Sequence, residues 1–127
     1  MHSKDLFEYA VIRVVPRVER EEFVNIGVIL FCTKQKFLQA SYHLDEPRLK
    51  AFCKELDIAE LKEHLYSFER ICRADKDAGP IGKLDTASRF RWLTATRSTV
   101  LQTSKVHPGM TEDASATLNR LFEQLVM

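Results

Sequence analysis

Two apolar, β-rich segments separated by a short charged stretch are the feature that most constrains the fold of this chain. The segments are residues 9–15 (YAVIRVV) and 23–31 (FVNIGVILF), and the stretch 16–22 between them begins with proline and is rich in Arg and Glu. β-branched and aromatic residues favour strands, and proline ends a strand because it removes a backbone donor. Consecutive strands joined by a short loop usually pair. The sequence therefore predicts a central β-hairpin.

Polar and small residues interrupt the apolar pattern of this hairpin. Arg13 lies within the first segment, and Asn25 and Gly27 lie within the second, where strict alternation puts both on one face together with Phe23, Ile29 and Phe31. A simple antiparallel register places Arg13 opposite or diagonal to Asn25, and Gly27 beside Val11. A charge within an apolar strand must reach an edge or find a partner. We therefore expect Arg13 and Asn25 to form a polar notch beside Gly27, which has no side chain.

The rest of the sequence predicts further strands and helices that complete one domain, residues 1–127. In chain order these are a strand at 37–42, helices capped by Asp45, by Asp57 (to Cys72) and by Asp85 (to about Ala95), a strand at 98–104, a turn at 107–109 and a last helix from about 111–113. This order predicts an α+β fold. The expected antiparallel sheet is a three-strand meander plus a later fourth strand, with helices packed mainly on one face.

Composition excludes several classes of protein. The 19 Lys and Arg residues nearly balance 18 Asp and Glu residues, which argues against a protein that binds a polyanion through bulk charge. The N-terminus is polar, and no apolar run approaches the length that spans a bilayer, so we expect a cytoplasmic protein with no membrane segment. Three widely spaced cysteines are typical of reduced thiols. We expect no metal and no cofactor.

A basic segment, residues 88–99, is the second candidate for a functional site. Between Lys83 and Thr111 the sequence holds five basic residues and one acidic residue, a local net charge of +4. Arginine forks, hydroxyls and backbone N–H groups at the bend near Ser98 suit a phosphate or a carboxylate. The candidates are Arg89, Arg91, Trp92, Arg97 and Ser98.

An alternative explanation needs no ligand. These arginines can instead bridge to the acidic turn at 19–22 or cover apolar surface with their aliphatic stems, with Trp92 in the core. Interleaved basic and aromatic residues also permit stacking on single-stranded nucleic acid. No RNA-binding motif accompanies these residues.

An enzyme is a further hypothesis, resting on His107. Ser98 or Thr99 could act with His107 as base and a carboxylate such as Glu22 as its orienter. No GxSxG or HExxH motif accompanies these residues, and the position of His107 before Pro108 and Gly109 favours a turn residue over a base. The enzyme hypothesis predicts His107 within hydrogen-bond reach of a hydroxyl or carboxylate, in a cleft lined by Asn25 and an arginine.

Several segments together resemble the DUF3037 family of uncharacterised bacterial proteins. They are YAVIR at 9–13 with Val15-Pro16, EFVNIGVILF at 22–31, SRFRWL at 88–93, and VHPG at 106–109 followed by a terminal helix. The residues that match the family pattern are Arg13, Glu22, Asn25, Gly27, Arg89, Arg91, Trp92, His107, Pro108 and Gly109. Thr96 stands where the pattern tends to carry proline.

The resemblance implies a small bacterial cytoplasmic protein with no established activity. Family members are often encoded beside HipA-like kinase proteins, which implies a partner or regulator of such a kinase. No catalytic role comes with the matching residues, because the family has none assigned.

Three functional hypotheses follow from these observations. The first is a non-enzymatic binding or regulatory module that contacts a protein and has an arginine-lined site for an anion or nucleic acid. The second is a small enzyme acting on a phosphate-bearing or nucleic-acid substrate, and the third is a homo-oligomer held by an uncovered sheet face. The candidate binding residues are Arg13, Asn25, Gly27, Arg89, Arg91, Trp92, Arg97, Ser98 and His107.

Overall fold

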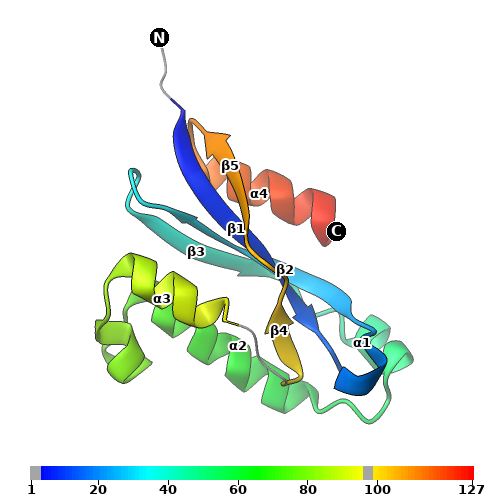
Figure 1. Cartoon of the computed structure of the whole chain (residues 1–127). Helices are drawn as coiled ribbons and strands as arrows, with labels where there is room; N and C mark the ends of the chain where they lie inside the picture. Colours follow the sequence, from blue (N-terminus) through cyan, green and yellow to red (C-terminus); the bar gives the residue numbers. More distant parts are fainter. Residues whose placement is uncertain (1–3, 96–98) are drawn as a thin grey trace.

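An antiparallel sheet of five strands runs through the computed structural model, which describes residues 4–95 and 99–127. Helices α1, α2 and α3 cover one face of the sheet and α4 covers the other (Figure 1). The fold is therefore α+β, as the sequence predicts. Within the described ranges no helix is long and apolar enough to cross a membrane. The elements are β1 (Asp5–Val14), η1 (Val18–Arg20), β2 (Val24–Cys32), β3 (Phe37–Tyr42), α1 (Glu46–Phe52), α2 (Ile58–Arg73), η2 (Lys76–Ala78), η3 (Pro80–Lys83), α3 (Thr86–Leu93), β4 (Leu101–Thr103), β5 (His107–Thr111) and α4 (Ala114–Leu125).

Strand β1 is the centre of the sheet, whose order is β3-β2-β1-β4, with β5 also paired to β1. Residues Asp5 to Tyr9 of β1 pair with β5, and Ile12 to Val14 pair with β4. Between them, Ser104 bonds twice to Val11: its N–H donates to the Val11 carbonyl, and its Oγ accepts from the Val11 N–H, both at 2.8 Å. β4 and β5 therefore act as one interrupted edge strand.

The predicted turn at 107–109 is wrong, because these residues begin β5. Pro108 lacks a backbone donor, which is tolerated here because β5 lies at the edge of the sheet. The strand forms because the backbone N–H and C=O groups along the outer edge of β1 need hydrogen-bond partners. That pairing is a contact between segments distant in sequence, so the turn residues by themselves do not indicate it.

A β-bulge at Ile26 changes the register between β1 and β2. Arg13 lies opposite Asn25 as predicted, but Gly27 lies opposite Ile12 and not Val11. A bulge inserts one extra residue, so the alternation of side chains reverses across it. The prediction that Asn25 shares a face with Ile29 is therefore wrong. Val24, Ile26, Ile29 and Phe31 pack in the core beneath α2 and α3, whereas Val28, Leu30 and Cys32 pack against α4.

Two hydrophobic cores hold the layers together. The larger lies between the sheet and helices α1 to α3, where the rings of Phe31 and Phe90 stack with centroids 5.2 Å apart. The smaller lies beneath α4, where Leu118 and Leu121 pack on β1 and β2. Alternate residues of the central strands pack into one core and then the other, which explains why both segments of the hairpin are almost continuously apolar.

The three predicted aspartate caps are confirmed, and Asp113 caps the last helix, α4, in the same way. The side chains of Asp45, Asp57, Asp85 and Asp113 accept hydrogen bonds from the backbone N–H three residues later. Such a cap satisfies a donor that the helix itself leaves unpaired. The bond from the Ser88 N–H also lowers the pKa of Asp85.

The stability of the fold is expected to fall in alkaline solution. Burial raises the pKa of the Cys72 thiol from 9.0 to about 12. Burial and the Glu69 carboxylate raise the pKa of Tyr42 from 10.0 to about 12. Both groups release protons more readily in the unfolded chain, so the free energy of unfolding should fall between about pH 9 and pH 12. Urea unfolding at pH 8 and pH 11 measures this fall.

The contribution of the two groups can be separated from general alkaline effects. Cys72→Ala and Tyr42→Phe should each flatten the decline in the free energy of unfolding between these pH values. An identical decline in the parent protein and in both variants would contradict the assignment.

Candidate functional site

Three polar side chains lie in a row across the sheet, each on a different strand. Arg13 of β1 lies opposite Asn25 of β2 on one side and opposite Gln102 of β4 on the other. Directly opposite residues of antiparallel strands point to the same face. That face is the one covered by α4, because Phe7 and Tyr9 precede Arg13 at two-residue spacing and pack in the α4 core. We call this row, with Phe23, the Arg13 notch.

The guanidinium of Arg13 has an unusual environment. Its carbon Cζ lies 3.8 Å from the centroid of the Phe23 ring. Among the described residues it forms no ion pair, and its Nε is buried without a hydrogen-bond partner. Desolvation lowers the pKa of Arg13, yet an arginine side chain stays protonated at neutral pH. The notch therefore presents a stacked cation without a carboxylate partner in the described part of the chain.

Asn25 connects the notch to the end of α4. Its Nδ2 donates to the Leu125 carbonyl at 3.3 Å, whereas its Oδ1 is buried without a partner. Asn25 also lines a pocket of about 220 Å³ between the start of α1 and the end of α4, which His43 and Arg48 line as well. Asp45 also lines this pocket, and Asn25 is the notch residue that reaches it.

Arg89, expected to belong to a basic binding surface, is instead an internal residue. It is 8% exposed, and its guanidinium lies at the junction of α2, η3 and α3. The acceptors of its hydrogen bonds are the carbonyls of Ile71, Cys72 and Leu84 and the hydroxyl of Thr86, at 2.8 to 3.1 Å. Arg89 caps the last carbonyls of α2, so its donors serve the fold and are not offered to a ligand.

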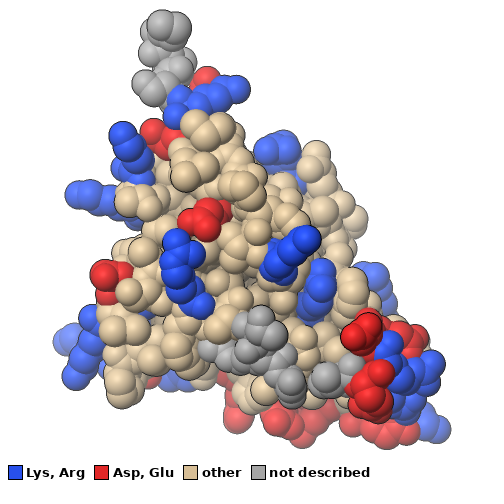
Figure 2. Space-filling view, viewed as in Figure 1, with Lys and Arg blue, Asp and Glu red and all other residues tan. Residues whose placement is uncertain are grey.

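Arg91 and Trp92 lie on the outer side of α3. The Arg91 side chain is 66% exposed, and its Nη2 lies 3.7 Å from Oε1 of Glu8. Trp92 is 41% exposed, so it is not the core residue that the alternative explanation assumed. In Figure 2 the Lys and Arg side chains on the visible face are dispersed among uncharged residues, whereas acidic side chains gather at the lower edge. Arg97 and Ser98 lie outside the described residues.

The described members of the two predicted sets, Arg13 with Asn25 and the residues of α3, lie on opposite faces of the sheet. Helix α3 packs through Phe90 and Leu93 on the face that carries Ile12, and Arg13 points to the other face. The residues of α3 therefore cannot join Arg13 and Asn25 in one site. Whether the two sets converge was open from the sequence, and within the described residues they form two separate surfaces.

Comparison with models of known protein families gave a match. It matches the family described as "Protein of unknown function (DUF3037)" over residues 9–126, nearly its whole length. The chain belongs to the DUF3037 family. The comparison with curated proteins and the comparison with solved structures gave no match. The matched range includes every residue of the Arg13 notch in this DUF3037 protein.

His107 of this DUF3037 protein lies away from Asn25 and Glu22, and Ser98, one of the hydroxyls expected to act with it, lies outside the described residues. The imidazole is half-buried against Tyr9, with ring centroids 5.3 Å apart. Arg13 is four residues farther along β1, about 14 Å at strand spacing, and Glu22 follows beyond the end of β1, where it pairs with Arg20. Glu22 is therefore not placed to orient His107, and Asn25 does not line a cleft beside it. Among the described residues no group of three or more potential metal ligands occurs.

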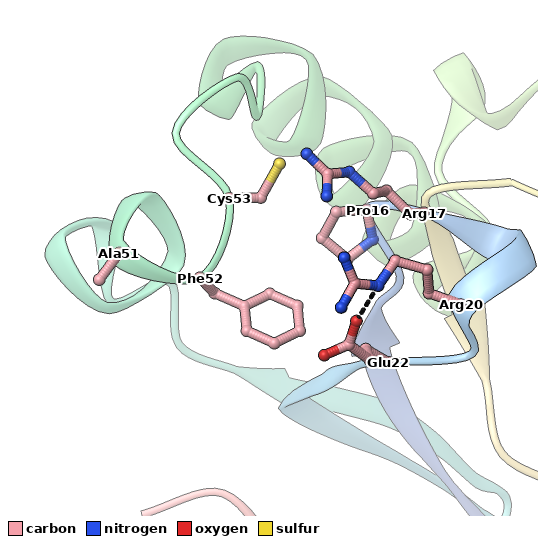
Figure 3. Close-up of a pocket in the computed structure, with 7 residues that line it drawn as sticks. All are labelled: Pro16, Arg17, Arg20, Glu22, Ala51, Phe52 and Cys53. Carbon is pink, nitrogen blue, oxygen red and sulfur yellow. Dashed lines mark ion pairs between the residues drawn. The ribbon is translucent and has the colours of Figure 1, made fainter.

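A pocket that the sequence did not indicate lies between the loop after β1 and the end of α1 (Figure 3). Its volume is about 210 Å³, and its lining includes Arg17, Arg20, Phe52 and Cys53. Glu22 pairs with Arg20 within the pocket, and Glu55 lies 4.0 Å from Arg17. Its cations are therefore already compensated, which makes it a weaker anion site than the Arg13 notch. Only the folded arrangement brings these two segments together.

Proposed function

We propose that this DUF3037 protein is a bacterial cytoplasmic binding module that acts by contact with another protein, and that Arg13 receives an acidic group of that partner. The observation that supports the proposal most directly is the Arg13 guanidinium itself. It lies in the middle of a sheet, stacked on Phe23, with no ion pair among the described residues. A desolvated cation gains most from an oppositely charged partner.

The chemistry of the notch favours a carboxylate. The planar guanidinium presents two parallel donors that match the two oxygens of a carboxylate, and stacking on an aromatic ring fixes its plane. The amide nitrogens of Asn25 and Gln102 already donate to the carbonyls of Leu125 and Thr99. Each amide nitrogen has a second N–H that can extend the hydrogen-bond network. The bulk charge of +1 supplies no general attraction for nucleic acid, so recognition depends on this local geometry.

The family resemblance adds a candidate for the partner. Because DUF3037 proteins are often encoded beside HipA-like kinases, we propose that the acidic group belongs to a kinase of this type. Contact with a kinase would make the protein a regulator of that kinase.

Substitution of Arg13 is expected to weaken partner binding. Tagged protein would be recovered from its native cells with Arg13→Ala, Arg13→Lys and, as an exposed arginine on α4, Arg120→Ala as the control. Retained proteins and nucleic acids would be identified, and the Kd of the purified partner measured by calorimetry. Loss of a charged hydrogen bond costs about 1.5–3 kcal/mol, so Arg13→Ala should raise the Kd about tenfold or more.

The other variants sharpen the result. Arg13→Lys should restore binding only in part, because an ammonium lacks the planar fork, and Arg120→Ala should bind like the parent protein. Equal partner binding by a folded Arg13→Ala variant would refute the role of Arg13. Recovery of nucleic acid in place of a protein partner would overturn the protein-contact proposal.

A further inference from the structure

Strand β3 forms one edge of the sheet, and its outer side has no strand partner among the described residues. The His43 N–H donates to the Ile26 carbonyl, which sets the alternation of hydrogen-bonded pairs between β2 and β3. By that alternation Phe37, Gln39 and Ser41 bond to β2, and the backbone groups of Leu38, Ala40 and Tyr42 point outward. The edge therefore presents a regular row of donors and acceptors.

The two edges of the sheet differ in how they are protected. The edge formed by β4 and β5 is interrupted at Ser104 and carries the exposed residues Lys105 and Pro108. Charges, prolines and interruptions of this kind discourage pairing with another chain. Strand β3, with the sequence FLQASY, has six uninterrupted residues and neither a charge nor a proline. Only β3 keeps the features of an edge that accepts another strand.

A pocket of about 270 Å³ lies beside this edge, between β3 and the last turns of α2. Leu38, Ala40 and Cys72 contribute apolar lining, and Gln39, Glu69 and Arg73 contribute polar lining. Arg73 Nη1 lies 3.0 Å from Glu69 Oε2, so the two charges at the pocket compensate each other. In a strand added to β3, every second side chain would point toward the α2 face. The pocket can take one apolar side chain from such a strand.

We propose that the outer edge of β3 docks an extended segment of a partner protein, which adds to the sheet as a further strand and places an apolar side chain in the pocket beside α2. Main-chain hydrogen bonds to Leu38, Ala40 and Tyr42 supply the affinity, and the pocket supplies selectivity. This surface is separate from the Arg13 notch, because β2 lies between β3 and β1. It extends the proposed function by a second, independent contact.

A second copy of this chain is a poorer occupant than an extended segment. Pairing two β3 edges through their outward residues would keep the α2 faces of both copies on one side of the joined sheet. Helix α2 packs directly against β3. Paired strands lie about 4.8 Å apart, whereas packed helices need about 8–10 Å. The two α2 helices would therefore collide, and a lone strand would not.

A random peptide library displayed on phage tests this proposal with the full chain as bait. Selected peptides should alternate apolar and polar residues, and their Kd, measured by calorimetry, should rise at least tenfold for Ala40→Pro. Proline at this position removes an outward N–H and leaves the bonds to β2 intact. Ala40→Gly keeps the N–H and is the matched control. Arg13→Ala should bind the peptides like the parent protein, which separates this surface from the notch.

A second measurement covers the case in which Ala40→Pro does not fold. In the parent protein, peptide binding should slow hydrogen exchange of the Leu38 and Ala40 amides, whereas the amides of β5 should be unaffected. Selection of no peptide, peptides without alternation, or unchanged exchange at Leu38 and Ala40 would overturn the proposal. A dimer seen by light scattering that Ala40→Pro dissociates would also overturn it, by assigning the edge to a second copy.

Discussion

Replacing Arg89 by methionine is expected to lower the free energy of unfolding by about 3–5 kcal/mol. Methionine preserves much of the aliphatic stem, so the change isolates the hydrogen bonds. Four acceptors lose their donor, among them the carbonyls of Ile71 and Cys72 at 2.8 Å. Buried carbonyls without partners are costly because water cannot replace the lost donor. Urea unfolding followed by circular dichroism measures the loss.

Arg91 is the matched control on the same helix. Its side chain is 66% exposed, and its one ion pair, to Glu8, spans 3.7 Å. Exposed ion pairs contribute about 0–1 kcal/mol, so Arg91→Met should leave the urea midpoint almost unchanged. Equal midpoints for the Arg89 and Arg91 variants would show that the internal hydrogen bonds of Arg89 do not stabilise the fold.

The second large effect is expected at Gly27 of β2, which lies opposite Tyr42 of β3. A Cβ atom at this position would lie 2.6 Å from the Ser41 carbonyl oxygen and 2.7 Å from Cβ of Tyr42. Gly27→Ala should therefore push β3 away from β2 and lower the free energy of unfolding by about 3 kcal/mol or more. Thermal unfolding followed by circular dichroism would report the change as a lower Tm.

Gly109→Ala provides a graded comparison. Its Cβ would meet the end of the Phe7 ring at 2.5 Å, and an aromatic side chain can shift where a backbone cannot. We expect a smaller loss of stability than for Gly27→Ala. A larger loss at Gly109 would show that the β2–β3 contact is more compliant than the structure indicates.

Most of the elements follow from local chemistry and could be predicted. The helix starts are set by aspartates that bond a backbone N–H only three residues away, as Asp57 does with Glu60. The strands of the hairpin follow from β-branched residues that both faces of the sheet bury. The direct pairing of Arg13 with Asn25 follows from the short loop between their strands.

The parts that could not be predicted depend on contacts distant in sequence. Strand β5 forms because β1 needs a partner along its outer edge, although the local sequence of His107 and Pro108 is typical of a turn. The bulge at Ile26 reverses the alternation of side chains between the two faces along β2, and no residue type in the sequence indicates it. Arg89 was expected at a surface because its charge is visible in the sequence and its four internal acceptors are not.

The sequence by itself determined the class of the fold, the helix starts and the presence of a charged residue inside an apolar hairpin, because each depends on interactions between near neighbours. Only the tertiary structure decided which face of the sheet each side chain occupies. The α3 layer takes the face of Ile12, and α4 takes the face of Arg13. Arg89 therefore bonds to carbonyls inside the α3 layer, and Arg13 lies on the other face. The two arginines cannot contribute to one site, because the sheet separates them.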